Sequence, residues 1–374
     1  MTVAVRPTAV PPAAAPRRPR RTALAALAAL VVLAPAACSG DDGAAAPTTT
    51  ATVRVPGVVE PTKAAPPEPA VPVVWPLTGV GTDAVAARPA LAVKIENSAV
   101  ARPQTGLEQA DVVVEEVVEG GITRFIAVYH SQVPGEVGPI RSIRPMDADL
   151  MAPLHGLLAF SGGQPQFVQR IQDAGVQVLS MDAGAPGFYR KRGVAPAPHN
   201  VYGTPETFWG QAAADRTSPP APLLPVALRA DAATAAQLGT PAASLTTTFS
   251  RSASPGWTWD GASGTWLRSE GPTASVSASG ARLAATNVLA LRVQVNPDVG
   301  RDPAGNPIPE TIVANSGGDG LLASGGKVLP VRWSMGATGS PLAVTTDTGA
   351  AVTLAPGTTW VELVPVTTGA ITTG

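Results

Sequence analysis

The sequence predicts an α+β protein in which an N-terminal mixed α/β sandwich domain, residues 75–210, precedes a β-rich C-terminal domain, residues 245–374. In the first part, apolar runs of strand length alternate with segments of helical spacing, a pattern typical of a mixed sheet covered by helices. In the second part, glycine turns separate short apolar runs, which favours strands. Residues 211–244 are rich in Ala and Pro, so we expect a connector there, with a short helix over 232–238 as an option.

Residues 1–37 have the pattern of an export signal peptide. A basic lead without acids is followed by an apolar run from Thr22 to Ala37, which is shorter than the ~20 residues of a membrane span. Small residues then precede Cys38, the only cysteine, as in a lipobox, although Pro35 stands where leucine is usual. We expect palmitate-type lipidation of Cys38 and anchoring to the cell membrane on its extracytoplasmic side. Ordinary cleavage and a retained anchor are the alternatives.

Residues 38–74 contain Ala, Pro and Thr runs with almost no large apolar side chain, which predicts a disordered tether. Five of the 26 basic residues precede Cys38, so the rest of the chain carries 21 basic against 27 acidic residues, a net charge of −6. Nucleic-acid binding needs clustered Lys and Arg. The acidic balance therefore excludes nucleic acid as the expected partner.

The expected strands of the first part are residues 91–95, 112–119, 122–130, 157–160 and 176–179, and the expected helices are 146–155 and 165–174. Gly120 and Gly121 lie between two β-branched runs, which indicates a hairpin because primed turns need positive φ. A two-residue turn would place Val117 opposite Arg124.

The second part is expected to contain strands at 257–260, 265–268, 287–295, 328–333 and 360–364, with turns around Gly317-Gly318 and at Gly349. Trp257 and Trp259 share a face at period two, and Trp266 lies across the next turn. We expect these indoles to form a core cluster. The alternative is an exposed platform that stacks on sugars or binds a protein.

An ordered series of motifs between residues 75 and 365 is similar to the YerB-like lipoprotein family. In the first part the motifs are Pro76-Leu77-Thr78-Gly79, Arg102-Pro103-Gln104-Thr105-Gly106-Leu107, Ala110-Asp111, Glu119-Gly120-Gly121-Ile122-Thr123-Arg124-Phe125, Gly138-Pro139-Ile140-Arg141-Ser142-Ile143-Arg144-Pro145, Gly162-Gly163, Phe188-Tyr189-Arg190 and Pro198-His199-Asn200. In the second part they are Thr286-Asn287-Val288, Gly326-Lys327 with Trp333, and Pro356-Gly357-Thr358-Thr359-Trp360. The resemblance implies an envelope lipoprotein with two domains of uncharacterised function. It also suggests a cell-wall synthesis protein or wall glycan as the partner.

The hairpin carries the first candidate binding residues. With a two-residue turn, Arg124 shares one face with Glu115 and Glu119, whereas Glu116 points to the other face. Because opposite faces cannot line one cleft, either Glu116 or the pair Arg124 and Glu119 has to drop out. The alternative is a solvated ion pair.

Arg141 and Arg144 lie in a Gly-Pro-led segment that enters the helix expected at 146–155. Guanidinium groups bind carboxylate and phosphate through paired N–H donors, and a helix N-terminus adds a favourable dipole. Ion pairs with Glu116, Asp147 or Asp149 are the simpler interpretation of these arginines. The alternative, which the binding hypothesis uses, is a pocket for an anion or a glycan carboxylate.

A polar loop supplies the third wall of the expected cleft. His199 and Asn200 follow a proline-rich stretch, and binding residues concentrate on such loops. Tyr189 and Arg190 are expected to join them. A hydrogen-bonded structural histidine is the alternative for His199.

An enzymatic alternative rests on Ser161, which lies between a strand and a helix with Ala159 where a nucleophile elbow has glycine. Asp182 and His199 would complete the triad, and a carboxylate such as Glu116 is a second option for a wall or ester hydrolase. A glycine turn is the simpler interpretation of Ser161. The three histidines lack metal-ligand spacing, and Gly318-Asp319-Gly320 indicates a hairpin turn because no helix follows it.

The expected function is therefore that of a non-enzymatic binding lipoprotein of the cell envelope, without metal or cofactor. Its ligand or partner protein would bind a cleft built from the basic, acidic and polar residues named above. Ser161 hydrolysis is the main alternative.

Overall fold

The structure is a computed structural model that describes residues 71–374. The signal segment, Cys38 and most of the expected tether lie outside the described residues. Within residues 71–374, no helix is both long and apolar enough to cross a membrane. The helices are α1 (Asp147–Met151), α2 (Pro165–Asp173), α3 (Pro205–Trp209) and α4 (Thr234–Leu238), with 3-10 turns at Ala99–Ala101, Leu107–Gln109, Glu119–Gly121, Ala152–Leu154 and Ala230–Ala232.

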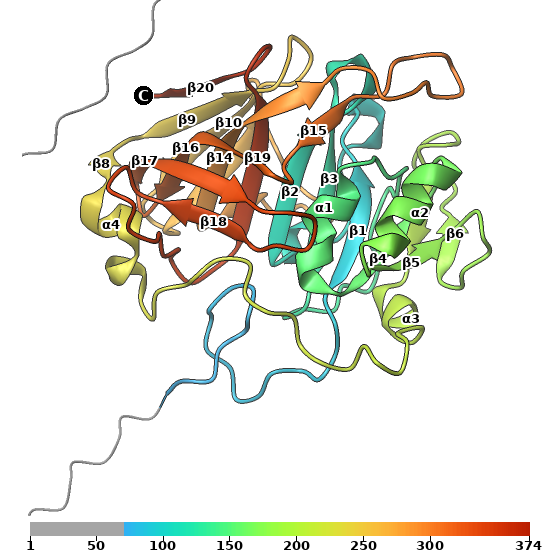
Figure 1. Ribbon diagram of the computed structural model, residues 1–374, viewed down its shortest axis with the longest axis horizontal. Helices are drawn as coiled ribbons and strands as arrows, with labels where there is room; N and C mark the ends of the chain where they lie inside the picture. The colour runs from blue at the N-terminus through green and yellow to red at the C-terminus, as the bar shows by residue number, and fades with distance from the viewer. Residues whose placement is uncertain (1–70) are drawn as a thin grey trace, which may run out of the picture. The chain divides into compact units, whose positions relative to one another are not determined.

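The main sheet contains 12 strands and crosses both parts of the chain. Its order is β18 (Leu342–Thr345), β17 (Lys327–Met335), β16 (Ser316–Ser324), β14 (Asn287–Asn296), β19 (Thr359–Pro365), β2 (Val112–Val117), β3 (Thr123–Tyr129), β1 (Leu91–Glu96), β4 (Leu157–Phe160) and β5 (Gln177–Ser180), and β15 (Glu310–Ile312) and β8 (Thr240–Pro241) pair with β14 and β17 off this path. Strand β19 joins the parts because it pairs in parallel with β14 on one side and with β2 on the other. Figure 1 shows red β19 beside teal β2.

Two smaller sheets complete the described fold. The six-stranded sheet has the order β12 (Thr273–Ala274), β11 (Thr265–Glu270), β10 (Pro255–Asp260), β9 (Ser244–Thr248) and β20 (Ala370–Thr373), with β13 (Ala284–Ala285) on β11. Strands β6 (Phe188–Arg190) and β7 (Val201–Gly203) form a two-stranded sheet. The predicted α+β class, with a mixed first part and a β-rich second part, is confirmed.

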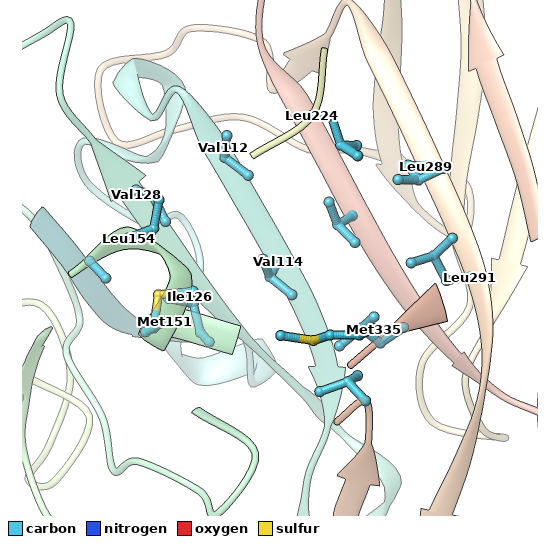
Figure 2. Close-up of a cluster of buried hydrophobic side chains, with 14 of the residues drawn as sticks. Val112, Val114, Ile126, Val128, Met151, Leu154, Leu224, Leu289, Leu291 and Met335 are labelled. Carbon is cyan, nitrogen blue, oxygen red and sulfur yellow. The ribbon is translucent and has the colours of Figure 1, made fainter. Parts of the chain in front are cut away.

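The central strands β1, β2 and β3 are buried along their whole length because both faces of the sheet are covered. Helices α1 and α2 lie over the first face (Figure 1), where Met151 and Ile171 pack on the sheet. Figure 2 shows the same apolar cluster extending across the parts, with Val114 of β2 and Leu291 of β14 facing a common space with Met335.

The second face packs on the six-stranded sheet through aromatic side chains. Trp257 and Trp266 are 1% and 0% exposed, and Trp360 lies edge-on between Trp257 and Phe125, with ring centroids 5.1 and 5.2 Å apart. The expected tryptophan core cluster therefore forms, and it joins the two parts of the chain.

The predicted hairpin exists, but its predicted register is wrong. Glu116 lies opposite Arg124, whereas a two-residue turn would have placed Val117 there. The turn takes in Glu119 as well as Gly120 and Gly121, both of which have positive φ. One additional loop residue moves every side chain of one strand to the other face.

The turn predicted at Gly317-Gly318, including the hairpin turn at Gly318-Asp319-Gly320, is also wrong, because these residues lie inside β16. A Cβ atom at Gly317 would lie 2.7 Å from the carbonyl oxygen of Trp333, and one at Gly320 would lie 2.6 Å from that of Ala290. The glycines here permit close approach of neighbouring backbones.

Candidate functional site

The observed register gathers charged side chains on the first face of the sheet. Glu96 of β1, Arg124 of β3 and Glu116 of β2 lie directly opposite one another across three strands. Lys94 occupies the same face two residues before Glu96. Arg124 and Glu116 therefore share a face, so the predicted separation of the two residues by the sheet is wrong.

Lys94 lies at the centre of this charge cluster. Its Nζ contacts Glu116 Oε1 and lies 2.7 Å from Asp147 Oδ1, and all three side chains are 0% exposed. Burial, and then the charge of Asp147, raise the pKa of Glu116 to about 8. Asp147 enters from the start of α1, where its other oxygen accepts the Arg144 N–H at 2.9 Å.

Two guanidinium groups share the single carboxylate of Glu119. Arg144 Nη2 donates to Glu119 Oε2, and Arg124 Nη2 lies 3.8 Å from the same oxygen. Arg124 also donates to the carbonyl oxygen of Ser142 at 3.0 Å. Burial, and then the charge of Arg144, lower the pKa of Arg124 to about 9.

Glu96 forms the third group of the cluster. His199 Nδ1 lies 2.7 Å from its Oε1, which also accepts the Ser98 hydroxyl at 2.7 Å. Arg141 Nε lies 3.4 Å from its Oε2. Arg141 and Arg144 thus both form ion pairs, but not with the predicted partners Glu116, Asp147 or Asp149. Arg141 pairs with Glu96, and Arg144 pairs with Glu119.

A cavity of about 480 Å³ opens beside Arg144; we refer to it as the Arg144 cavity. Its N-terminal wall consists of Ser142, Arg144, Gly162, Gly163, Gln164, Phe167 and Asp182, and its C-terminal wall consists of Arg301, Asp302, Pro303 and Ile308. The N-terminal wall forms because the Ile143 N–H donates to the Gly162 carbonyl oxygen at 3.1 Å, which holds the arginine segment against the start of α2. Gln164 Nε2 donates to the Arg301 carbonyl oxygen at 2.5 Å and closes the two walls.

The polar loop does not join this cavity. Tyr189 donates to Glu136, and Arg190 donates to Asn200 Oδ1 at 2.9 Å near the surface. His199 lines a separate cavity of about 170 Å³ with Tyr202. Arg141 and His199 thus meet at Glu96, and Arg124 and Arg144 meet at Glu119. Tyr189, Arg190 and Asn200 contact other partners, and the predicted residues do not line one pocket.

The structure does not assemble the catalytic triad. The Ser161 hydroxyl donates to Met181 Sδ at 3.5 Å, while His199 pairs with Glu96. Among residues 71–374, no group of three or more His, Cys, Asp or Glu residues is placed to hold a metal ion.

Glu115, which the predicted register had placed beside Arg124, lies on the opposite face. It accepts Arg268 Nη2 at 2.8 Å and the Thr123 hydroxyl at 2.6 Å. Glu362 of β19 is its partner in the strand register, and burial, then the charge of Glu115, raise the pKa of Glu362 well above its ordinary value. This second buried cluster connects the two parts of the sheet.

Sequence reasoning missed Lys94 and Glu96. Both stand at alternate positions of the apolar strand Leu91–Glu96, and a lysine inside such a run is rarely buried unless it is paired. The lysine within this apolar strand was therefore the signal that could have revealed the cluster. It predicts that Lys94 has a buried acidic partner, but it does not identify that partner.

Comparison with known proteins identifies the family. Residues 77–218 match the N-terminal domain, and residues 245–361 the C-terminal domain, of the "Protein of unknown function (DUF3048)". This chain belongs to the DUF3048 family. Each family domain supplies one wall of the Arg144 cavity.

The DUF3048 chain is similar to a protein from Bacillus subtilis (strain 168) named "Putative lipoprotein YerB", with 36% identity over 129 residues. That match covers 34% of this chain and 39% of the relative. The crystal structure of the YerB protein from Bacillus subtilis has a TM-score of 0.68 at 25% identity, covering 80% of this chain and 99% of that one. The predicted family and fold class are therefore confirmed.

Proposed function

We propose that this DUF3048 protein is a lipid-anchored, non-enzymatic binding protein of the cell envelope that faces the extracytoplasmic side. Three observations support this role. The sequence before Cys38 resembles a lipobox, the chain is similar to a relative named as a lipoprotein, and the family domains enclose a cavity. The proposed ligand is a wall-associated molecule or a glycan group.

The Arg144 cavity is the observation on which the binding role depends. Its volume of about 480 Å³ falls in the range of ~300–1,000 Å³ typical of small-molecule sites. A ligand there contacts Arg144 of one family domain and Arg301 of the other. This concave shape favours a wall glycan group over a cell-wall synthesis protein, because protein partners usually bind broader and flatter surfaces.

The chemistry around the cavity favours binding over hydrolysis. A nucleophile needs an adjacent base that is itself oriented, but the Ser161 hydroxyl faces a thioether sulfur. Glu116 has no exposed surface and is held by Lys94. Neither group is available to a substrate in the cavity.

The anchoring part of the proposal is tested by metabolic palmitate labelling of cells that produce the full chain or its Cys38→Ala variant. We expect label and membrane fractionation in the first case and loss of both in the second, because two acyl chains are needed for stable anchoring. An unlabelled wild-type chain, or a Cys38→Ala chain still held in the membrane fraction, would contradict lipid anchoring.

The binding part is tested by placing a photo-crosslinking amino acid at Pro303, an exposed residue of the cavity wall. The control position is Leu238, 63% exposed at the end of α4 and absent from the cavity lining. We expect crosslinked wall fragments, identified by mass spectrometry after wall digestion, only from position 303. Equal yields from both positions, or a protein as the main product at 303, would overturn the wall-ligand proposal.

A further inference from the structure

We infer that an apolar cavity beneath the connector between the two family domains is a binding site for the acyl chain of a lipid, and that residues 217–224 are its movable cover. This site shares no lining residue with the Arg144 cavity. The inference rests on the proposed function in one respect, since membrane anchoring supplies bilayer lipids as the source of the chain.

The cavity lies on the first face of the main sheet and has a volume of about 70 Å³; we refer to it as the apolar cavity. Both family domains line it, with Val114 of β2 on one side and Leu291 of β14 and Met335 of β17 on the other. Figure 2 shows these side chains together with Leu224 of the connector. No charged side chain of residues 71–374 lines the apolar cavity.

The polar side-chain groups of the lining are already hydrogen-bonded. Trp333 Nε1 donates to the Arg292 carbonyl oxygen at 3.1 Å, and the Thr359 hydroxyl accepts Asn287 Nδ2 at 3.2 Å. A cavity of this kind stays dry and accepts hydrocarbon. A sugar, an ion or a peptide would instead bury polar groups without partners there. The lining therefore favours a hydrocarbon ligand.

Four apolar side chains mark where the apolar cavity approaches the surface. Leu150 and Pro153 at α1, Leu223 of the connector and Leu342 of β18 are half-buried, whereas the other lining residues are buried. An apolar chain can enter between such side chains while a polar head group stays in solvent. The site thus suits an amphiphile that inserts only its hydrocarbon end.

Residues 217–224, the connector segment, cover the apolar cavity without hydrogen bonds. Leu224, which is 6% exposed, lines the cavity together with Leu223. Among the described residues, no group of the connector segment makes a hydrogen bond, and the nearest ones lie at Arg216 and Pro225. Three of its eight residues are prolines, which have no N–H to donate. Apolar contacts therefore hold the cover in place.

Both ends of the connector segment are fixed. The Arg216 guanidinium donates to the carbonyl oxygens of His155 at 2.6 Å and Gly175 at 2.7 Å. At the other end, the Leu354 N–H donates to the Pro225 carbonyl oxygen at 2.9 Å. A segment without hydrogen bonds between two fixed ends opens at a lower free-energy cost than its flanks.

Opening of the cover provides the space that a chain needs. The closed cavity of about 70 Å³ holds only the end of an acyl chain. Withdrawal of Leu223 and Leu224 enlarges it, and the bound chain replaces the apolar contacts that these side chains lose. Met151 and Met335 also line the cavity, and their flexible side chains adapt to a chain of variable position.

The experiment places a small diazirine-bearing aliphatic amino acid at Leu223 of the full chain in cells. The control position is Leu228, which is 72% exposed in the same connector and does not line the cavity. After irradiation, the purified chain is digested and lipid adducts are identified by mass spectrometry. We expect at least about tenfold more acyl-lipid adduct at 223 than at 228, because each buried methylene group favours binding.

Three results of this experiment would overturn the inference. Similar yields at the two positions would show contact with the bilayer surface alone. No lipid adduct at either position would show that the apolar cavity is a gap in packing. An isoprenoid as the main adduct at 223 would exclude an acyl chain as the ligand.

Charged variants test whether the lipid enters between the half-buried side chains. In the chain that carries the crosslinker at 223, Leu342→Asp or Leu150→Asp is expected to lower the adduct yield at least about tenfold, because a carboxylate there disfavours hydrocarbon. Leu228→Asp is the matched control and should leave the yield unchanged. Circular dichroism checks that each variant is folded. Unchanged yield from a folded Leu342→Asp or Leu150→Asp chain would contradict the inference.

This inference and the proposed function fail separately. If palmitate does not label Cys38 but position 223 still yields acyl-lipid adducts, the apolar site stands and the anchoring proposal is wrong. If the chain is anchored and position 303 captures wall fragments but position 223 yields no lipid, only the acyl-chain site is wrong.

Discussion

Glu116 has no solvent contact, yet it shares the ammonium group of Lys94 with a second carboxylate, Asp147. One cation cannot fully stabilise two buried anions, so the proton binds more tightly to Glu116 in the folded state. Single residues in this protein therefore acquire their protonation states from partners on other strands and helices.

Glu116→Gln tests this protonation state. The folded-state pKa of Glu116 is about 8, above the ordinary 4.5, so its contribution to stability is complete below pH ~4.5 and is lost as the pH rises through about 8. Glutamine mimics the protonated acid. We expect the free energy of unfolding, measured with urea, to fall less between pH 6 and pH 9 in the variant than in the wild type. A parallel decline in both proteins would show that Glu116 is ionised throughout.

At the residue scale, the sequence selected several side chains that do meet. Arg124 and Arg144 both pair with Glu119; the sequence grouped Glu119 with Arg124 through the hairpin, but for Arg144 it offered only Glu116, Asp147 or Asp149 as ion-pair partners. Tyr189 and Arg190 instead contact Glu136 and Asn200. Side chains on a surface loop take whichever partners the loop path brings near, and no local pattern encodes that path.

At the element scale, one loop residue decided the geometry of the site. The sequence indicates a hairpin around Gly120-Gly121, and the structure contains it. The alternation of apolar and polar residues along the strands does not show whether Glu119 belongs to the strand or to the turn. Its inclusion in the turn brings Glu116 to the face of Arg124.

Alanine substitutions at the two glycines test the turn. Both have positive φ, and a Cβ at Gly121 would lie 2.9 Å from Ser250 Oγ, whereas one at Gly120 meets nothing within 4 Å. We expect Gly120→Ala to lower the free energy of unfolding by about 1–2 kcal/mol and Gly121→Ala by more. Gly135→Ala, at an exposed position with no neighbour within 4 Å, is the control in urea unfolding. A larger loss from Gly120→Ala than from Gly121→Ala would contradict this turn geometry.

At the scale of the whole molecule, the two family domains form one structural unit. Strand β19 of the second part lies between β14 and β2, and residues of both parts share the apolar clusters on the two faces of the sheet. Arg268 of the second part neutralises Glu115 of the first while its guanidinium lies 5.2 Å from the Phe125 ring centroid. The Arg144 cavity depends on the packing of the two family domains against each other, because each domain supplies one wall.

Arg268→Ala tests whether the two family domains unfold as one structural unit. The side chain is 1% exposed, and its loss leaves Glu115 buried without its cation, a change that costs about 3–5 kcal/mol. We expect that decrease in urea unfolding, with circular dichroism and tryptophan fluorescence still following one transition. The double variant Arg268→Met with Glu115→Gln should recover part of the loss. Two separate transitions in the wild type would contradict a single structural unit.

The sequence by itself indicated the fold class, the order of many of its strands and helices, the family, and several of the residues from which the site is built. These are local properties, since hydrophobic periodicity and glycine turns operate over a few residues. Only the tertiary structure decided that β19 lies between β14 and β2, that Glu116 faces Arg124, and that Arg144 meets a cavity wall from the other family domain. Strand pairing between distant segments and the register of a sheet depend on the packing of complete faces, which no short stretch of sequence specifies.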